Sequence, residues 1–117
     1  YGSHPIGVGH KLLEDGTVAP YGALSFLPFT PQESKAALEH MYKIPGLVGK
    51  YGLYDAYSYA TKANGDQPWI GKSYLGIDKG LVLLMFENFS TQLIWKLLHQ
   101  NKSIQKGLKR LAFSQTN

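Results

Sequence analysis

The sequence predicts an all-α fold in which the helices form inner and outer pairs. Two segments, 19–27 and 76–89, consist mostly of small or apolar residues, which is typical of helices that are buried on most sides. Each segment is followed, after a short turn, by an amphipathic helix with one polar face. Because this order occurs twice, we expect concentric inner and outer helices, as in a helical barrel.

The first pair has clear helix signals. Its inner segment, APYGALSFL at 19–27, carries no charge. The outer helix should start at TPQE (30–33), where Thr30 can cap, Pro31 suits the first helical position and Glu33 completes a capping box. It should end at Pro45-Gly46. Its outward face should carry four charged residues, namely Glu33, Lys35, Glu39 and Lys43.

The second pair lies in the C-terminal part. Segment 76–89 has only three charged residues, Asp78, Lys79 and Glu87. An amphipathic helix over 91–100 should follow, and then a last helix over about 103–113. Between the two pairs, segment 47–73 is rich in Tyr and Gly and lacks a helical period. Strand character is conceivable at 53–59, but we interpret the whole segment as one long aromatic loop with a functional role.

Composition limits the classes of function. The chain has 117 residues, a net charge of +4 and no Cys, which fits one domain and excludes disulfides and thiolate metal sites. Eleven Lys and a single Arg argue against nucleic-acid binding. No apolar run approaches the roughly 18–20 residues of a membrane span. The chain starts at Tyr1 without Met in a Gly-rich stretch, so we expect 1–117 to be part of a longer polypeptide.

Three of the eight carboxylates are candidates for chemistry: Asp55, Asp78 and Glu87. Asp78 falls in the first turn of the buried helix, where it could cap the helix and interact with its dipole, or could face a pocket as a general acid or base. Glu87 lies nine positions later, about 13–14 Å along the axis, and we expect it to reach free N–H groups where the next helix begins.

Other candidate residues belong to loops. Asp55 lies in the aromatic string YGLYDAY (51–57), and aromatic rings beside carboxylates are typical of sugar-binding sites, although aromatic loops also pack cores. Asp66, in ANGD, is expected in a turn. His4 and His10 could bind a ligand hydroxyl, but no metal-binding spacing is present and no metal is expected. Fingerprints of Ser-His-Asp hydrolases and of phosphate or dinucleotide loops are absent.

Several strings together resemble a known family. They are YGLYDAYS, then Trp69, YLGIDKGLVLLMFENF, LIWKLL and GLKRLAF, with DGTVAPYGALSFLPFTPQESKAAL upstream. They are similar to the C-terminal third of the bacterial glucoamylase-like family, which includes endo-β-1,2-glucanases and the glucoamylase-like domain of cyclic β-1,2-glucan synthases. Two departures from the family pattern are Lys79, where Gln is more usual, and Leu81, where Pro is common.

The resemblance implies an (α/α)6 toroid of twelve helices, of which 1–117 is the C-terminal part. It implies a glycoside hydrolase acting on β-linked glucan, chiefly β-1,2-glucan, by carboxylate acid/base catalysis without a cofactor. Asp78 would be the base, and the acid would belong to the preceding part of the barrel. Sugar rings would stack on three aromatic residues and hydroxyls would bind two polar ones, the five being Tyr54, Trp69, Tyr74, Asp55 and His10.

The resemblance also favours a periplasmic or secreted location. Two alternatives stay open on the sequence alone. One is a barrel of this family that binds glucan without cleaving it. The other is a self-contained helical interaction module whose basic C-terminal end contacts an acidic partner.

Overall fold

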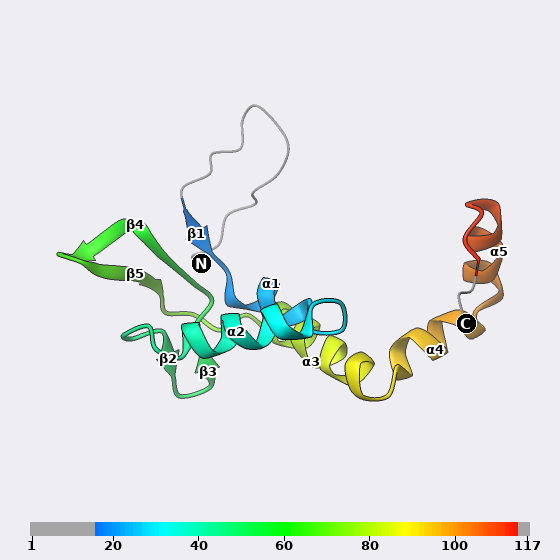
Figure 1. The fold of residues 1–117 in the computed structure, drawn as a ribbon, viewed down its shortest axis with the longest axis horizontal. Coiled ribbons are helices and arrows are strands. Elements are labelled where there is room, and N and C mark those ends of the chain that lie inside the picture. The colour runs from blue at the N-terminus through cyan, green and yellow to red at the C-terminus, as the bar shows by residue number, and fades with distance from the viewer. Residues whose placement is uncertain (1–15, 115–117) are drawn as a thin grey trace, which may run out of the picture.

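The computed structural model describes residues 16–114, and the side chains of all of these except 61–64. The described chain is elongated, with the strands at one end and the C-terminal helix at the other (Figure 1). Its elements in chain order are β1 (Thr17–Val18), α1 (Pro20–Ser25), α2 (Pro31–Met41), β2 (Val48–Gly49), β3 (Gly52–Leu53), β4 (Ala56–Asn64), β5 (Gln67–Gly71), α3 (Gly76–Ser90), α4 (Leu93–Gln100) and α5 (Lys102–Arg110).

The first helix pair forms as predicted, with one difference at its start. α1 packs against both α2 and α3, and Ser34 Oγ on α2 donates to the carbonyl of Ala23 on α1 at 2.9 Å. Pro31 occupies the first turn of α2. The predicted capping box is wrong: Thr30 makes no side-chain cap hydrogen bond, and its hydroxyl instead donates to the carbonyl of Phe26 at 3.4 Å. The Thr30 hydroxyl therefore stabilises the turn between α1 and α2 and does not cap α2.

The prediction of one long aromatic loop is wrong, and the fold is not purely helical. β1, β4 and β5 form an antiparallel sheet with β4 in the middle, and β2 pairs with β3. In β4 the consecutive residues Ala56, Tyr57 and Ser58 are all buried. Both faces of this strand are covered, so the two-residue alternation that identifies a half-exposed strand does not arise.

The β4–β5 hairpin closes at the turn that the sequence predicted. Gly65 has φ of 63° there, a value that glycine adopts at little cost, and Asp66 is exposed beside it. Pro68 sits in β5, which is an edge strand of the sheet, where the missing N–H does not interrupt the sheet.

The hydrophobic core lies where the end of α2 meets the strands. Its buried members are Met41, Ile44, Leu47, Leu53 and Tyr57. Partly buried residues of α1 and α2 pack against it, as do Tyr54 and Ile70. This core fixes the β2–β3 hairpin and the following residues against the helices.

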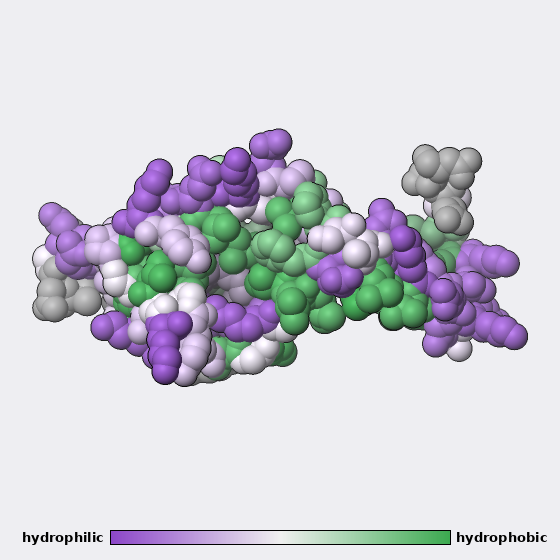
Figure 2. Space-filling model, turned by 90° about the horizontal axis from the view of Figure 1, so that it is seen from below, coloured by the Kyte–Doolittle hydropathy of each residue, from purple (hydrophilic) through white to green (hydrophobic). Residues whose placement is uncertain are grey.

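α3 is less buried than the sequence predicted. Among its described side chains only Asp78 and Asn88 are buried, whereas Ile77 is 80% and Leu83 70% exposed. The reason is that only α1 and α4 pack substantially against this helix, which leaves the rest of its apolar surface uncovered. Figure 2 shows apolar side chains gathered across the middle of one face of the molecule. Contiguous exposed apolar surface of this kind is typical of sites that contact another protein segment, a membrane or a ligand.

The junction between α3 and α4 is held by side-chain hydrogen bonds. The Thr91 hydroxyl donates to Glu87 Oε1 at 2.6 Å and accepts from the Leu93 N–H at 3.1 Å, while Asn88 Oδ1 accepts from the Trp95 N–H at 3.1 Å. The Glu87 side chain thus contacts the Thr91 hydroxyl and not the free N–H groups that were predicted; Thr91 is the residue that accepts from an N–H at the start of α4. The two helices meet at 88°. Among the described residues no single helix has the length and apolarity to cross a membrane, although α3 and α4 taken together would pass by those two criteria.

α5 extends the chain away from the sheet (Figure 1). The Asn101 side chain accepts from the N–H groups of Ser103 and Ile104 at 2.9 and 3.3 Å, which caps the helix. The last predicted helix is therefore confirmed, with its start at Lys102 and its end at Arg110.

Candidate functional site

A cavity of about 270 Å³ opens at the N-terminal end of α3. It is enclosed by α1, the end of α2, the segment after β3 and the first three turns of α3. Most of its lining is apolar, and its charged side chains are Asp55, Asp78 and Lys79. The lining residues are Pro20, Tyr21, Leu24, Leu38, Tyr42, Gly52, Leu53, Tyr54, Asp55, Leu75, Asp78, Lys79, Val82 and Phe86.

Asp78 is placed in this cavity by the first turn of α3. Its side chain is only 7% exposed, and its Oδ2 atom has no hydrogen-bond partner among the described residues. The capping alternative finds no support, because Leu75 is the N-cap residue and α3 has no side-chain cap hydrogen bond. A buried carboxyl oxygen without a protein partner is costly to maintain, which makes this position a functional candidate.

Asp55 approaches Asp78 from the segment that links β3 to β4. It is 4% exposed, and its side chain forms a hydrogen bond with that of Asp78. Burial, and then the hydrogen bond and negative charge of Asp55, raise the pKa of Asp78 to about 6 from an ordinary value of 3.8, while the nearby Lys79 charge acts in the opposite direction. Asp78 is therefore a stronger base than an exposed aspartate.

Lys79 ties the start of α3 to the strand region. Its ammonium group donates to the carbonyl of Leu53 at 2.6 Å and lies 5.7 Å from the centre of the Tyr74 ring. The carbonyl comes from the residue that ends β3, two positions before Asp55. The hydrogen bond therefore holds the two carboxylate-bearing segments in one arrangement.

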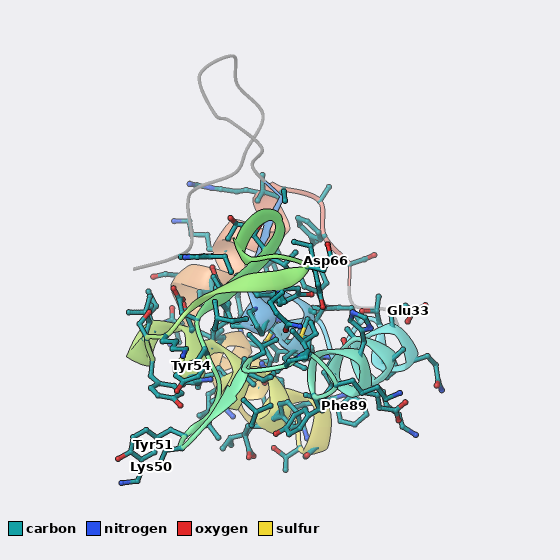
Figure 3. All side chains as sticks on the ribbon, turned by 90° about the vertical axis from the view of Figure 1, so that its left-hand side faces the viewer. Glu33, Lys50, Tyr51, Tyr54, Asp66 and Phe89 are labelled. Atoms are coloured by element: carbon teal, nitrogen blue, oxygen red, sulfur yellow. The ribbon has the colours of Figure 1, made fainter. Side chains whose placement is uncertain are left out.

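A group of tyrosines borders the cavity. The rings of Tyr54 and Tyr74 lie 4.9 Å apart between centres, and a hydrogen bond with Tyr74 raises the pKa of Tyr54. The Tyr51 ring is 5.4 Å from that of Tyr74, but Tyr51 extends from the β2–β3 turn, whereas Tyr54 lies closer to the body (Figure 3). Tyr54 is thus the member of this group that lines the cavity.

Gly49 allows this tyrosine arrangement. A Cβ atom at position 49 would overlap the hydroxyl of Tyr74 and the ring end of Tyr54. Both side chains lie directly over the Gly49 backbone, so a Cβ atom does not fit at position 49 unless these rings move.

We expect Gly49→Ala to displace the Tyr54 ring and to destabilise the fold by about 1 kcal/mol, at the low end of the cost of overpacking, since half-buried rings can move away from the added methyl group. Urea unfolding of the protein that contains this chain measures the change. Gly46→Ala is the comparison for steric overlap, because nothing lies within 4 Å of a Cβ there, although its φ of 78° adds a backbone cost of its own. If the wild type and Gly49→Ala have equal m-values and the variant loses no stability, the packing of the two rings over Gly49 is contradicted.

Among residues 16–114, no group of three or more His, Asp or Glu side chains has an arrangement that could hold a metal ion. The chemistry that the described residues offer is that of a buried carboxyl pair beside a phenol. Such a pair can accept or donate a proton at one defined position in a mostly apolar cavity.

Comparison with known proteins then identifies the family. A family model described as "Glycoamylase: Putative glucoamylase" matches residues 1–102. The chain belongs to this glucoamylase-like family. The resemblance noted in the sequence is therefore confirmed, and the match ends where α5 begins.

Three relatives of this glucoamylase-like chain show the range of similarity. The exo-β-1,2-glucooligosaccharide sophorohydrolase (non-reducing end) of Parabacteroides distasonis is 34% identical over 100 residues, which cover 84% of this chain and 13% of that protein. An endo-β-1,2-glucanase from Chitinophaga pinensis, solved with sophorotriose and glucose, is 40% identical with a TM-score of 0.66 over 82% of this chain and 22% of its own. A putative glucoamylase from Bacteroides fragilis is 38% identical, with a TM-score of 0.69, and the match covers 87% of this chain and 23% of that protein. The chain thus spans less than a quarter of each.

The structure brings together some of the predicted site residues. Asp78, Asp55 and Tyr54 share the cavity. Tyr74 contacts Tyr54 but does not line the cavity. Trp69 lies on β5 opposite Ser58 and is outside the cavity lining. His10 lies outside the described residues.

Two residues of the site were missed as such in the sequence. Lys79 was noted only as a departure from the family pattern, and its hydrogen bond to Leu53 depends on a contact across 26 residues. Gly49 gave no signal, because its role depends on two rings that reach it from other segments. The pairing of Asp55 with Asp78 likewise needed the fold.

Proposed function

We propose that this chain is part of a glycoside hydrolase that cleaves β-linked glucan, with β-1,2-glucan as its substrate. The observation that carries the proposal is the Asp78 carboxyl, buried in a cavity with one oxygen unpartnered. The relatives support the substrate class, because two of them are named for hydrolysis of β-1,2-linked glucans or glucooligosaccharides.

In the proposed reaction Asp78 acts as the general base. Its free oxygen takes a proton from a water molecule, and the water oxygen forms a bond to the anomeric carbon as the glycosidic bond breaks. The leaving oxygen takes a proton from a carboxylic acid in another part of the barrel. A base with a pKa of about 6 is mostly ionised at neutral pH and still accepts a proton more readily than an exposed aspartate.

Substrate binding is assigned to the residues beside that base. Tyr54 presents an aromatic ring for the apolar face of a sugar, and Asp55 offers a hydrogen-bond partner for a hydroxyl or for Asp78. Tyr74 supports the Tyr54 ring. Trp69 and His10 stay predictions as sugar-binding residues.

The uncovered apolar surface fits the proposal that this chain supplies only part of an (α/α)6 barrel. α1 packs between α2 and α3, as two neighbouring inner helices with an outer helix would require. We propose that the remaining helices of the same barrel cover the exposed apolar residues of α3 and complete the substrate cleft.

Hydrolysis of defined glucans tests the proposed function. The protein that contains this chain is incubated with linear β-1,2-, β-1,3- and β-1,4-glucans, and new reducing ends are measured. We expect release from the β-1,2-glucan at least about 100-fold faster than from the other two, because a hydrolase site that is built around one linkage discriminates strongly.

Other outcomes separate the alternatives. Binding of β-1,2-glucan by calorimetry without new reducing ends would replace hydrolysis with a glucan-binding role. Neither binding nor cleavage, together with a cooperative thermal transition of monomeric residues 1–117, would favour a self-contained interaction module.

A further inference from the structure

We propose that Tyr51, at the tip of the β2–β3 hairpin, is an outer sugar-binding residue that contacts a β-linked glucan chain where it leaves the cavity that holds Asp78. This inference rests on the proposed function, because it assigns a further binding position to the same substrate. It adds to Tyr54 a second ring that lies outside the cavity rather than in its wall.

Three tyrosine rings lead from the cavity to the outside of the described chain. Tyr54 lines the cavity. The centre of its ring is 4.9 Å from that of Tyr74, and the Tyr74 ring centre is in turn 5.4 Å from that of Tyr51. Figure 3 shows Tyr51 at the projecting end of the hairpin, with Tyr54 closer to the body. Ring contacts therefore connect a lining residue of the cavity to an exposed aromatic side chain.

The Tyr51 side chain is accessible in spite of these contacts. The residue is 67% exposed, the largest exposed fraction among the described tyrosines. A phenol has a flat apolar ring and a polar tip, and the C–H groups on one face of a pyranose ring pack well against such a flat surface. A linear glucan that extends beyond the cavity wall at Tyr54 can therefore place a further sugar unit on Tyr51.

The hairpin holds this ring in a defined place. The pairing of β2 with β3 leaves a turn of two residues, Lys50 and Tyr51. Leu53, which ends β3, is 4% exposed and belongs to the hydrophobic core, so the base of the hairpin is anchored. At the tip, the Tyr51 N–H donates to the Tyr74 hydroxyl at 3.3 Å. A side chain on such a fixed backbone loses little conformational entropy on binding, so more of the contact energy appears as affinity.

Lys50 supplies a polar group beside the ring. Its ammonium lies 5.2 Å from the centre of the Tyr51 ring. An ammonium group donates hydrogen bonds and accepts none, and sugar hydroxyls accept from such donors. A flat ring next to a hydrogen-bond donor matches a sugar unit, which presents both C–H groups and hydroxyls. The two tip residues therefore fit the same class of ligand that we propose for the cavity.

The dependence of cleavage on chain length tests this role. Reducing-end release is measured in the protein that contains this chain, with linear β-1,2-glucooligosaccharides of increasing length. We expect kcat/KM of the wild type to rise with length until the oligosaccharide reaches Tyr51. Tyr51→Ala should lose about 3–10-fold in kcat/KM on the longer oligosaccharides, the factor of one aromatic ring contact, and should match the wild type on the shortest one that is cleaved. The backbone hydrogen bond to Tyr74 can persist in this variant.

Further variants separate the ring from its bulk. Tyr51→Phe keeps the ring and should retain the wild-type length dependence. Tyr51→Leu keeps apolar bulk without a flat ring, should behave as Tyr51→Ala does, and replaces that variant if it does not fold. Tyr59→Ala is the matched control, because Tyr59 is an exposed tyrosine of β4 outside the cavity lining, and it should leave the length dependence unchanged. If neither Tyr51→Ala nor Tyr51→Leu folds, the ring is needed within the protein and the inference is overturned.

The outcomes distinguish this inference from the proposed function. If the wild type cleaves glucan and folded Tyr51→Ala keeps its length dependence, the inference alone fails. An equal loss at every length with a lower urea midpoint also overturns it, since Tyr51 would then pack against another part of the protein. If the wild type binds the oligosaccharides without cleaving them, hydrolysis fails, and calorimetry on the same variants still decides the role of Tyr51. Absence of both binding and cleavage removes both proposals.

Discussion

Asp78→Asn is expected to lower kcat on β-1,2-glucan by roughly 10²–10⁴-fold, the loss that accompanies removal of a general base. The amide has the same shape as the carboxyl and can still hydrogen-bond to Asp55, but it cannot take a proton from water. Substrate contacts made by Tyr54 should persist, so KM should change far less than kcat. Initial rates of reducing-end release over a range of glucan concentrations measure both constants in the protein that contains this chain.

The matched control is Glu87→Gln on the same helix. Glu87 accepts from the Thr91 hydroxyl at 2.6 Å, an interaction that a Gln side chain can keep, and it lies outside the cavity lining. This variant should retain the wild-type kcat. Normal turnover by Asp78→Asn, beside a normal control, would remove Asp78 from the reaction and leave the cavity without a base.

Helices were more predictable from this sequence than strands. Segment 76–89 was predicted as a helix on composition alone, and α3 runs from Gly76 to Ser90. Pro31 marked the start of α2 because its fixed φ suits the first turn. β4 was missed because three consecutive residues are buried, a pattern that carries no period. The burial of α3 was overestimated because an apolar composition indicates that a helix can be buried, but does not show which other elements pack against it.

Individual residues of the site could be predicted from the sequence, but the contacts between them could not. Asp78 could be selected because an acid at the start of an apolar helix is conspicuous. Its partner could not, since Asp55 is brought to it by the strand pairing and by the backbone bond to Ser73. Trp69 was chosen for its ring alone, and the pairing of β5 with β4 places it outside the cavity lining. The type of a residue indicates the chemistry it can perform, but which residues it contacts depends here on how the strands pair.

The same substitution that removes activity should stabilise the protein above neutral pH. The pKa of Asp78 rises from 3.8 to about 6 on folding, so the folded state binds the proton more tightly than the unfolded state. The folding free energy is therefore least affected below about pH 4, and stability decreases as pH rises through the folded-state pKa of about 6, until Asp78 is mostly ionised above about pH 7. At pH 7.5 the ionised, buried carboxylate costs on the order of 3 kcal/mol at most.

Asp78→Asn should remove that cost, so we expect a gain of about 1–2 kcal/mol at pH 7.5 and a much smaller one at pH 4, where the wild-type carboxyl is neutral in the folded state. Urea midpoints of the wild type, Asp78→Asn and Glu87→Gln at the two pH values measure the difference. A gain of equal size at both pH values would point to packing rather than charge as its cause. A loss at pH 7.5 would mean that the ionised carboxylate is stabilised by contacts beyond those of the described residues. The predicted gain would instead show that the protein maintains an unfavourable charge at this position, which is expected of a catalytic base and not of a structural aspartate.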